Sequence, residues 1–439
     1  MNQGDKNQPG TAMERRFFFI KHVQLLIIFN LACWLDVSLF AQPQPGDIFR
    51  EYDWIMPPEG EKFLRVGGKL DYRLTPDKFS GHILDKGGGL LFSDQIDLKQ
   101  ATKAELTLEK LLSHEDTKGL RVSFNGNPYQ MVPEASQIPE PQSDYYHHFY
   151  PTIEIPLDYL KVSGNRICLA VGSAQEWNWP QHLIYGLILR IYYDRSPEQM
   201  QGEILVEGNK ITATTKIRFQ PELVQSITKV DFIGKYTGLD YEGNGVYDQW
   251  HYHHHRGQLT HHIGTGNQPD FSTSWNTEWL PDQPDPIAVS AWVSDSTGLT
   301  YFLPPLKNLQ IERDYSIELC KPYDQPERWV TRGDKHTQKV RIEGDLKKAV
   351  AAKLVWTSWS PGYMNGLYVN DFLIFIRGGE KYAYEVMEVP LNYNLFVLKA
   401  GENTISTGKT PLYEGQMVHG MEVMWPGIML LVKYKNRKL

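Results

Sequence analysis

Short runs in which apolar and polar residues alternate, each closed by a turn signal, recur along the chain from residue 64 onward. Ala104–Leu108 alternates in this way, and Leu120–Phe124 alternates again and ends at Asn125-Gly126, a dipeptide typical of hairpin turns. Apart from a single turn near 98–103, no stretch sustains the 3.6-residue period of a helix. The pattern therefore predicts an all-β chain built from β-sandwich modules.

The same order of runs occurs twice along the chain. Ala352–Trp356 corresponds to Ala104–Leu108, and LKAGENTI at 398–405 corresponds to LKVSGNRI at 160–167. Further runs correspond in the same order. This indicates either two copies of one β-sandwich or two sandwiches that share only their turn signals.

These motifs carry a family resemblance. A strand that ends in V-x-x-N-G, as at 122–126, followed by L-x-x-G-x-N-x-I and a closing apolar strand, resembles the galactose-binding-like jelly rolls. LKAGENTI fits the second motif, whereas LKVSGNRI lacks the Glu and is shifted by one residue. The resemblance implies a jelly roll in each copy and, because such modules occur beside glycoside hydrolases and polysaccharide lyases, sugar binding. The motif Asn is expected to cap a turn and to set the register of the next strand.

The stretch between the two copies contains six or seven strand candidates. Its sequence AVSAWVSDSTG at 288–298 resembles the late strand and following turn of immunoglobulin-like modules in secreted bacterial proteins. We therefore predict a signal peptide at 1–41, a galactose-binding-like β-sandwich at 42–196, an immunoglobulin-like β-sandwich at 197–313 and a second galactose-binding-like β-sandwich at 314–439.

The N-terminal segment has the features of a secretory signal. Arg15 and Arg16 precede a mostly apolar run at 17–35, and Ala41 is suited to cleavage before Gln42. This predicts a secreted, periplasmic or cell-surface protein. The alternative is an uncleaved anchor, since the run approaches the length that spans a bilayer. No later stretch is long and apolar enough, so the mature chain is predicted to have no membrane span.

Composition and charge bear on the partner. The formal net charge of −7 argues against nucleic acid, because phosphate binding needs a basic face. Aromatic residues make up 12% of the chain, with 12 Trp and 24 Tyr, which favours β-structure and also sugar-binding surfaces. Carbohydrate is therefore the predicted partner. Cys168 and Cys320 fall in different predicted modules, which argues against a disulfide.

An acidic loop at 240–248 is a candidate calcium site. Asp240, Glu242 and Asn244 occupy alternate positions, and Val246 (through its carbonyl) and Asp248 complete the first nine positions of an EF-type loop. His251 stands at position twelve, where that loop uses a bidentate Glu. The two interpretations are a structural calcium site and a Gly-rich hairpin loop that holds no ion.

A histidine-rich hairpin follows the acidic loop. The sequence predicts a strand at 250–255, a turn at Arg256-Gly257 and a return strand at 258–263. This register would bring His251, His253 and His262 to one face, where neutral imidazoles could bind zinc or copper. The alternatives are an exposed hairpin and a platform that faces a sugar or a neighbouring module.

Two groups of aromatic residues are candidates for stacking on sugar rings. The first contains Trp177, Asn178, Trp179 and His182. The second, in WTSWSPGY, contains Trp356, Trp359 and Tyr363. Packing in a core or an interface is the alternative for each group.

The chain contains no nucleophile elbow, P-loop, HExxH motif or dinucleotide glycine motif. The resemblance to galactose-binding-like modules, together with the aromatic surplus, implies non-catalytic binding of a polysaccharide or glycan as the leading hypothesis. The alternatives are a structural or scaffold surface protein, and a glycan-active hydrolase or lyase with its site at a module junction. For the enzyme, the acid and base candidates by residue type are Glu278, Asp282, Glu385 and Glu388.

Overall fold

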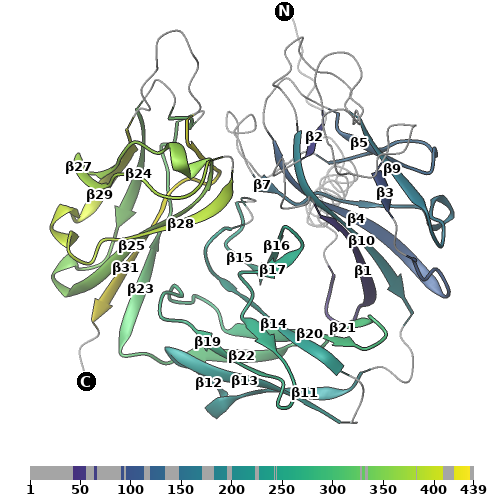
Figure 1. Cartoon of the computed structure of the whole chain (residues 1–439). Helices are drawn as coiled ribbons and strands as arrows, with labels where there is room; N and C mark the ends of the chain where they lie inside the picture. The colour runs from purple at the N-terminus through teal and green to yellow at the C-terminus, as the bar shows by residue number, and fades with distance from the viewer. Residues whose placement is uncertain are drawn as a thin grey trace, which may run out of the picture. The chain divides into compact units, whose positions relative to one another are not determined.

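The computed structural model describes part of the chain (Figure 1). The described residues are 43–55, 64–66, 90–92, 95–112, 119–133, 148–170, 182–194, 200–222, 227–241, 243, 245–326, 329–331, 335–381, 383–408 and 420–435. Within these ranges the helical elements are the 3-10 turns Leu157–Tyr159 (η3), Glu207–Asn209 (η4), Leu346–Lys348 (η5), Pro361–Tyr363 (η6) and Leu395–Val397 (η7). No helix of the described part is long and apolar enough to cross a membrane. The predicted signal peptide lies outside these ranges.

The fold is all-β, as predicted, and the described strands form six sheets. The largest contains β12 (Lys210–Ile211), β22 (Leu306–Ile311), β20 (Ile287–Asp295), β21 (Thr300–Phe302), β1 (Ile48–Ile55), β10 (His182–Tyr193), β4 (Ala101–Leu112) and β7 (His148–Phe149), in that order. Five strands pair at its sides: β2 (Leu64–Val66), β8 (Thr152–Glu154), β14 (Ile227–Thr237), β15 (Asp248–His251) and β18 (Gly264–Gly266).

The other sheets are smaller (Figure 1). One has the order β3 (Leu90–Phe92), β9 (Asn165–Ala170), β5 (Arg121–Phe124) and β6 (Gln130–Met131); another has β11 (Gly202–Val206), β13 (Thr214–Pro221) and β19 (Ser272–Asn276); and a hairpin joins β16 (His253–His255) to β17 (Gln258–Thr260). Two more follow: β23 (Tyr315–Cys320), β31 (Met429–Lys435), β25 (Ala349–Trp359) and β28 (Tyr384–Pro390), with β30 (Glu422–Val423) on β25; and β24 (His336–Ile342), β29 (Gly401–Thr407), β26 (Leu367–Val369) and β27 (Phe372–Phe375).

The first core lies between the β1-β10-β4 part of the large sheet and the β3-β9-β5-β6 sheet. Because successive side chains of a strand point to opposite faces, Leu106 and Leu108 of β4 enter this core and are fully buried. Glu105 and Glu109 belong to the other face of the same strand, which is also buried. The strand therefore serves both a core and a polar interface.

The C-terminal core lies between the β23-β31-β25-β28 sheet and the β24-β29-β26-β27 sheet. Its largest side chains are Trp329 and Trp356, both with no exposed surface. A middle core lies between β11-β13-β19 and strands β14, β20 and β22, and includes Phe219 and Phe232. Cys168 is half-buried, Cys320 is buried, and no disulfide joins these two residues.

The motif Asn caps a turn in both sandwiches, which confirms its expected role. Asn165 donates to the Lys161 carbonyl at 2.6 Å and accepts from the Lys161 backbone N–H at 2.8 Å. Asn403 makes the same two bonds with Lys399, at 2.7 and 2.8 Å. Each also accepts a hydrogen bond from the asparagine in the hairpin turn of its own sandwich, at 2.9 and 2.7 Å. The two segments therefore share one local geometry.

Strand β1 joins the sheets of the first and middle cores. It pairs with β10 over its whole length, and Ile48 and Phe49 also pair with Tyr301 and Thr300 of β21. Residues assigned from sequence to separate modules therefore share one continuous sheet. Sequence pattern could not reveal this pairing, because the partners lie about 250 residues apart and carry no motif for each other.

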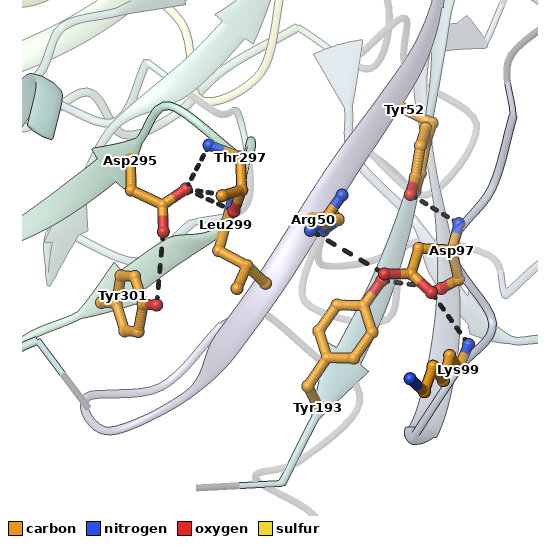
Figure 2. A network of polar contacts seen from close by, with 9 residues as sticks. All are labelled: Arg50, Tyr52, Asp97, Lys99, Tyr193, Asp295, Thr297, Leu299 and Tyr301. Atoms are coloured by element: carbon orange, nitrogen blue, oxygen red, sulfur yellow. Dashed lines mark hydrogen bonds and ion pairs between the residues drawn. The ribbon is translucent and has the colours of Figure 1, made fainter. Parts of the chain in front are cut away.

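Polar contacts fix the region beside this join. Figure 2 shows Asp97, whose backbone N–H donates to the Tyr52 hydroxyl at 2.9 Å and whose carbonyl accepts from Tyr193 at 2.7 Å. Arg50 lies 3.8 Å from the Asp97 carboxylate. On the β21 side, Asp295 closes its own turn by accepting from the Thr297 backbone N–H at 2.8 Å.

Candidate functional site

An aromatic pocket of about 330 Å³ lies beside the acidic loop. Four of its lining residues are aromatic, namely Tyr236, Tyr241, Trp275 and Trp279. Asn276, Lys353 and Glu388 supply polar groups. The residues come from β14 and its following loop, from β19 and its following loop, and from β25 and β28. We call this cavity the aromatic pocket.

Tyr236 is held in place from behind. Its ring stacks on His251 at a centroid distance of 4.2 Å, and His251 Nε2 lies 2.8 Å from the Tyr236 carbonyl, to which it donates. A Cβ on Gly234 would lie 2.6 Å from the Tyr236 ring, and a Cβ on Gly238 would lie 2.8 Å from the His251 ring. The two glycines therefore make room for this stack. Burial lowers the pKa of His251 to about 4, which keeps the imidazole neutral at pH 7.

Tyr241 is supported in the same way. Its ring stacks on His261 at 3.8 Å, and His261 packs against His253 at 4.5 Å. Burial lowers the pKa of His261 to about 4, and the charges of neighbouring histidines add to this shift. The ring of Tyr241 remains partly exposed. The pocket therefore gains a second ring whose orientation is fixed by a neutral histidine.

Trp279 is held by two lysines. Lys433 Nζ lies 4.6 Å from the ring centroid and Lys353 Nζ lies 5.2 Å from it. Lys433 forms an ion pair with Glu278 at 2.7 Å and Lys353 one with Glu388 at 2.9 Å. The pairs balance charge beside the ring, so the pocket is polar without a strong net charge.

This arrangement is suited to binding a sugar. Ring faces of fixed orientation can pack on the apolar face of a pyranose, and the Asn276 amide with the Lys353–Glu388 pair can bond hydroxyl groups. Of the described residues that line the pocket, Glu388 is the one carboxylate. Glycoside hydrolysis ordinarily uses two carboxyl groups, and the described lining supplies one of them.

One further cavity adjoins the aromatic pocket, and a third adjoins that second cavity. A cavity of about 480 Å³ shares Pro281 with it, and a third, of about 380 Å³, shares Asp282 and Ser316 with the second. The three cavities therefore follow the loop at 279–286 in sequence.

A second polar cluster lies between the first sandwich and the histidine hairpin. The Glu109 carboxyl accepts from the Arg256 backbone N–H at 2.9 Å and lies 3.7 Å from His255 Nδ1. Burial raises the pKa of Glu109 to about 8, against the opposing effect of Arg256. Nearby, Arg190 Nε donates to Glu51 Oε1 at 2.6 Å. Burial alone would raise the pKa of Glu51, but the charge of Arg190 outweighs the effect of burial and holds the pKa of Glu51 well below its usual range.

The calcium prediction stays a prediction. Asp240 is buried and its Oδ2 accepts from the Gly245 backbone N–H at 2.7 Å, while the Val246 carbonyl accepts from Gln249 at 2.9 Å. Asp248 is exposed at the start of β15. The other two predicted ligands, Glu242 and Asn244, lie outside the described residues.

The hairpin turn is confirmed, but the predicted transition-metal cluster is wrong. His253 pairs with Thr260 and His255 pairs with Gln258, as predicted. His251, however, pairs with Gly234 of β14, because β15 joins the large sheet instead of extending the hairpin. His262 Nε2 lies 3.0 Å from Thr265 Oγ1. The described part of the chain contains no group of three His, Cys, Asp or Glu that could hold a metal ion.

Of the seven predicted sugar-contact residues, three are buried in the structure and three lie outside the described residues. Trp177, Asn178 and Trp179 lie outside the described residues. His182 is fully buried, with Nδ1 3.3 Å from Lys110 Nζ. Trp356 has no exposed surface, so these two predictions are wrong.

Trp359 and Tyr363 lie away from the aromatic pocket. Trp359 is 4% exposed and packs with Tyr185 and Tyr384 of the interface between the first and C-terminal sandwiches, so its prediction as a sugar contact is also wrong. Tyr363 is partly exposed, beneath Lys381 Nζ at 4.8 Å.

Sequence reasoning missed most of the pocket. Tyr236, Trp275, Asn276 and Trp279 were not among the predicted site residues, and Glu388 was noted only as a carboxylate. One signal was present: SWNTEW at 274–279 has the same Trp-Asn pattern as the predicted WNW group. The sequence around Lys353 contains no pattern that would have predicted its place in the pocket.

No protein-family model matches the sequence, and no curated protein matches it. Among solved structures, the chain is similar to a β-porphyranase of glycoside hydrolase family 86 from the human gut bacterium Bacteroides plebeius, with 12% identity, 55% of this chain and 37% of that chain covered, and a TM-score of 0.23.

It is also similar to a DUF4785 family protein from Legionella pneumophila, with 10% identity, 90% and 85% covered and a TM-score of 0.22. A third is a β-1,2-glucanase from Parabacteroides distasonis, with 9% identity, 62% and 38% covered and a TM-score of 0.21. The chain spans 34–37% of the length of the first three solved structures that it matches. Likenesses of this degree carry no inference about its activity.

Proposed function

We propose that this is a secreted, non-catalytic carbohydrate-binding protein whose binding site is the aromatic pocket. One observation carries the proposal: Tyr236, Tyr241 and Trp279 line a single pocket, and each ring is already oriented by a histidine or by lysines behind it. A preorganised ring loses little conformational freedom when ligand binds. The ligand is a linear glycan chain, because the loop at 279–286 also lines two further cavities.

The test is a glycan array of polysaccharides and oligosaccharides, probed with the mature chain and with Trp279→Ala and Tyr241→Ala. The matched control is Tyr129→Ala, because Tyr129 is a 44% exposed tyrosine on the first sandwich, beside Arg121. We expect both pocket variants to lose binding and the control to keep it. An array that stays blank, or pocket variants that bind like the wild type, would contradict the proposal.

Calcium is part of this proposal as a structural ion of the 240–248 loop. Asp240 is buried at the root of the loop that carries Tyr241. A cation held there by Asp240 and Asp248 would stiffen the loop and thus the position of Tyr241. Binding to the array should then weaken in EDTA and recover with added calcium.

The second candidate is a glycan-active enzyme, and the observation that favours it is Glu109. A buried carboxyl whose pKa is raised to about 8 can act as a general acid, and His255 lies 3.7 Å away. Release of reducing sugar from a bound polysaccharide, abolished by Glu109→Gln, would establish this function in place of the first. Absence of release from glycans that do bind would exclude it.

A further inference from the structure

An exposed apolar patch covers one edge of the C-terminal sandwich. Phe372 and Leu373 are each 50% exposed, Ile376 is 65% exposed, and Phe396 is 74% exposed. Phe396 packs edge-on against Phe372, with ring centroids 5.8 Å apart. Contiguous exposed apolar surface of this kind usually marks a binding face. We call these four residues the edge patch.

The patch coincides with the end of a sheet. Strand β27 is the last strand of its sheet, and the described residues pair it with β26 alone (Figure 1). An edge strand presents unpaired backbone N–H and C=O groups to a further strand. Native proteins commonly protect such edges with charges or proline, whereas β27 reads Phe-Leu-Ile-Phe and carries only one irregularity, a register shift at Ile374.

The sequence around β27 is complementary to itself when read antiparallel. If two copies pair about Ile374, Leu373 lies opposite the partner's Phe375 and Phe372 lies opposite the partner's Ile376. In the same register Asp371, in the left-handed turn before β27, and Arg377, just after β27, flank the paired strands from the two copies. Both charged side chains are exposed; Asp371 is 88% exposed and lies 3.5 Å from Lys335 Nζ of its own chain. A two-fold axis repeats each contact, so the apolar centre is closed by two opposite-charge pairs.

We propose that the protein forms a homodimer through antiparallel pairing of β27 with β27 of a second copy. The charge complementarity within one register favours a second copy over a different partner. The inference is independent of the proposed sugar site, which uses other strands. If both hold, the dimer carries two aromatic pockets, and binding to one polysaccharide chain gains from avidity.

Sedimentation velocity of the mature chain across a wide concentration range is the primary test. We expect a monomer–dimer equilibrium that Leu373→Lys abolishes. Val350→Lys is the matched control, because Val350 is 49% exposed on β25 of the same sandwich and lies outside the patch. Arg377→Asp should weaken dimerisation about tenfold by facing Asp371 of the partner with a like charge. Arg377→Asp combined with Asp371→Lys should restore it.

Each result decides the matter, provided that circular dichroism shows each variant folded. A wild type that stays monomeric overturns the inference. A dimer that persists in Leu373→Lys places the interface elsewhere. A dimer that Leu373→Lys abolishes but the double charge exchange does not restore refutes the proposed register, and with it the pairing described above.

Discussion

Asn403→Asp tests whether the motif asparagine holds the C-terminal sandwich together, because the change alters chemistry without altering shape. In the structure Asn403 is fully buried, and its amide donates to the Lys399 and Gly401 carbonyls at 2.7 and 2.9 Å. Its Oδ1 accepts from the Lys399 N–H and the Asn370 amide at 2.8 and 2.7 Å. Aspartate keeps the acceptor but places a second oxygen opposite two carbonyls.

The expected loss follows from those two carbonyls. A buried group that loses its hydrogen-bond partner costs about 1–3 kcal/mol, so two such groups cost roughly 4 kcal/mol in the free energy of unfolding. A loss of this size is a large share of the roughly 5–15 kcal/mol by which a domain is stable. Protonated aspartate can donate one bond, so the loss should be smaller in acid.

Urea unfolding monitored by tryptophan fluorescence measures this loss, because Trp329 and Trp356 are buried in the same core. Asn165→Asp should produce a smaller loss in the first sandwich, about 1–3 kcal/mol, because the Asn165 amide donates to the Lys161 carbonyl, at 2.6 Å, where the Asn403 amide donates to two carbonyls. Asn392→Asp, at an exposed site, is the control. A change below about 1 kcal/mol for Asn403→Asp would refute the reasoning, since a single lost bond would already exceed it.

Three further predictions concern the pocket and its surroundings. Trp279→Ala should weaken glycan affinity about tenfold or more by calorimetry, because an oriented aromatic ring is a typical hot spot; an unchanged affinity would remove Trp279 from the site. Affinity should rise with oligosaccharide length beyond one or two sugars, because the loop at 279–286 lines three cavities, and a plateau at the shortest ligand would confine binding to one pocket. Glu109→Gln should raise the melting temperature at pH 8 but not at pH 5. The pKa of Glu109 is raised from 4.5 to about 8 in the folded protein, so protonation of this carboxyl stabilises the fold. That stabilisation is complete below about pH 4.5 and is lost as the pH rises to 8, whereas Gln is neutral at both pH values. Equal shifts at both pH values would contradict that titration. His251 and His261 have lowered pKa values, so they reduce the stability of the fold as the pH falls from 6.5 towards 4. This change is the same in variant and wild type, so comparing the two at each pH removes it.

Local sequence patterns predicted local structure well. The alternating runs predicted the strands, the Arg256-Gly257 turn set the hairpin register, and the motif asparagines Asn165 and Asn403 cap their turns. Each of these features depends on residues that are neighbours in sequence. The pairing of β1 with β21 depends on residues far apart, and no local pattern records it.

The aromatic pocket escaped prediction for the same reason. Tyr236, Trp275 and Lys353 come from three strands, and the packing of Leu239 against Val355 and Leu431 accompanies their approach. The prediction that Trp356 contacts a sugar was wrong because Trp356 follows Val355 on β25, and adjacent residues of a strand point to opposite faces. Alternation sends Val355 toward the pocket loop and Trp356 into the core, and sequence does not say which face of a doubly buried strand meets a ligand.

Two histidines of this region, His251 and His261, support aromatic rings of the pocket. A run of imidazoles at alternate positions is as suitable for supporting rings as for binding metal, and the choice depends on what each ring faces. His251 faces Tyr236 and His261 faces Tyr241, at stacking distance. Burial keeps both neutral at pH 7, so they add no charge beneath the aromatic rings. Because an imidazole is flat and can also donate to a carbonyl, as His251 does to Tyr236, it fixes both the ring and the backbone of the residue that it supports.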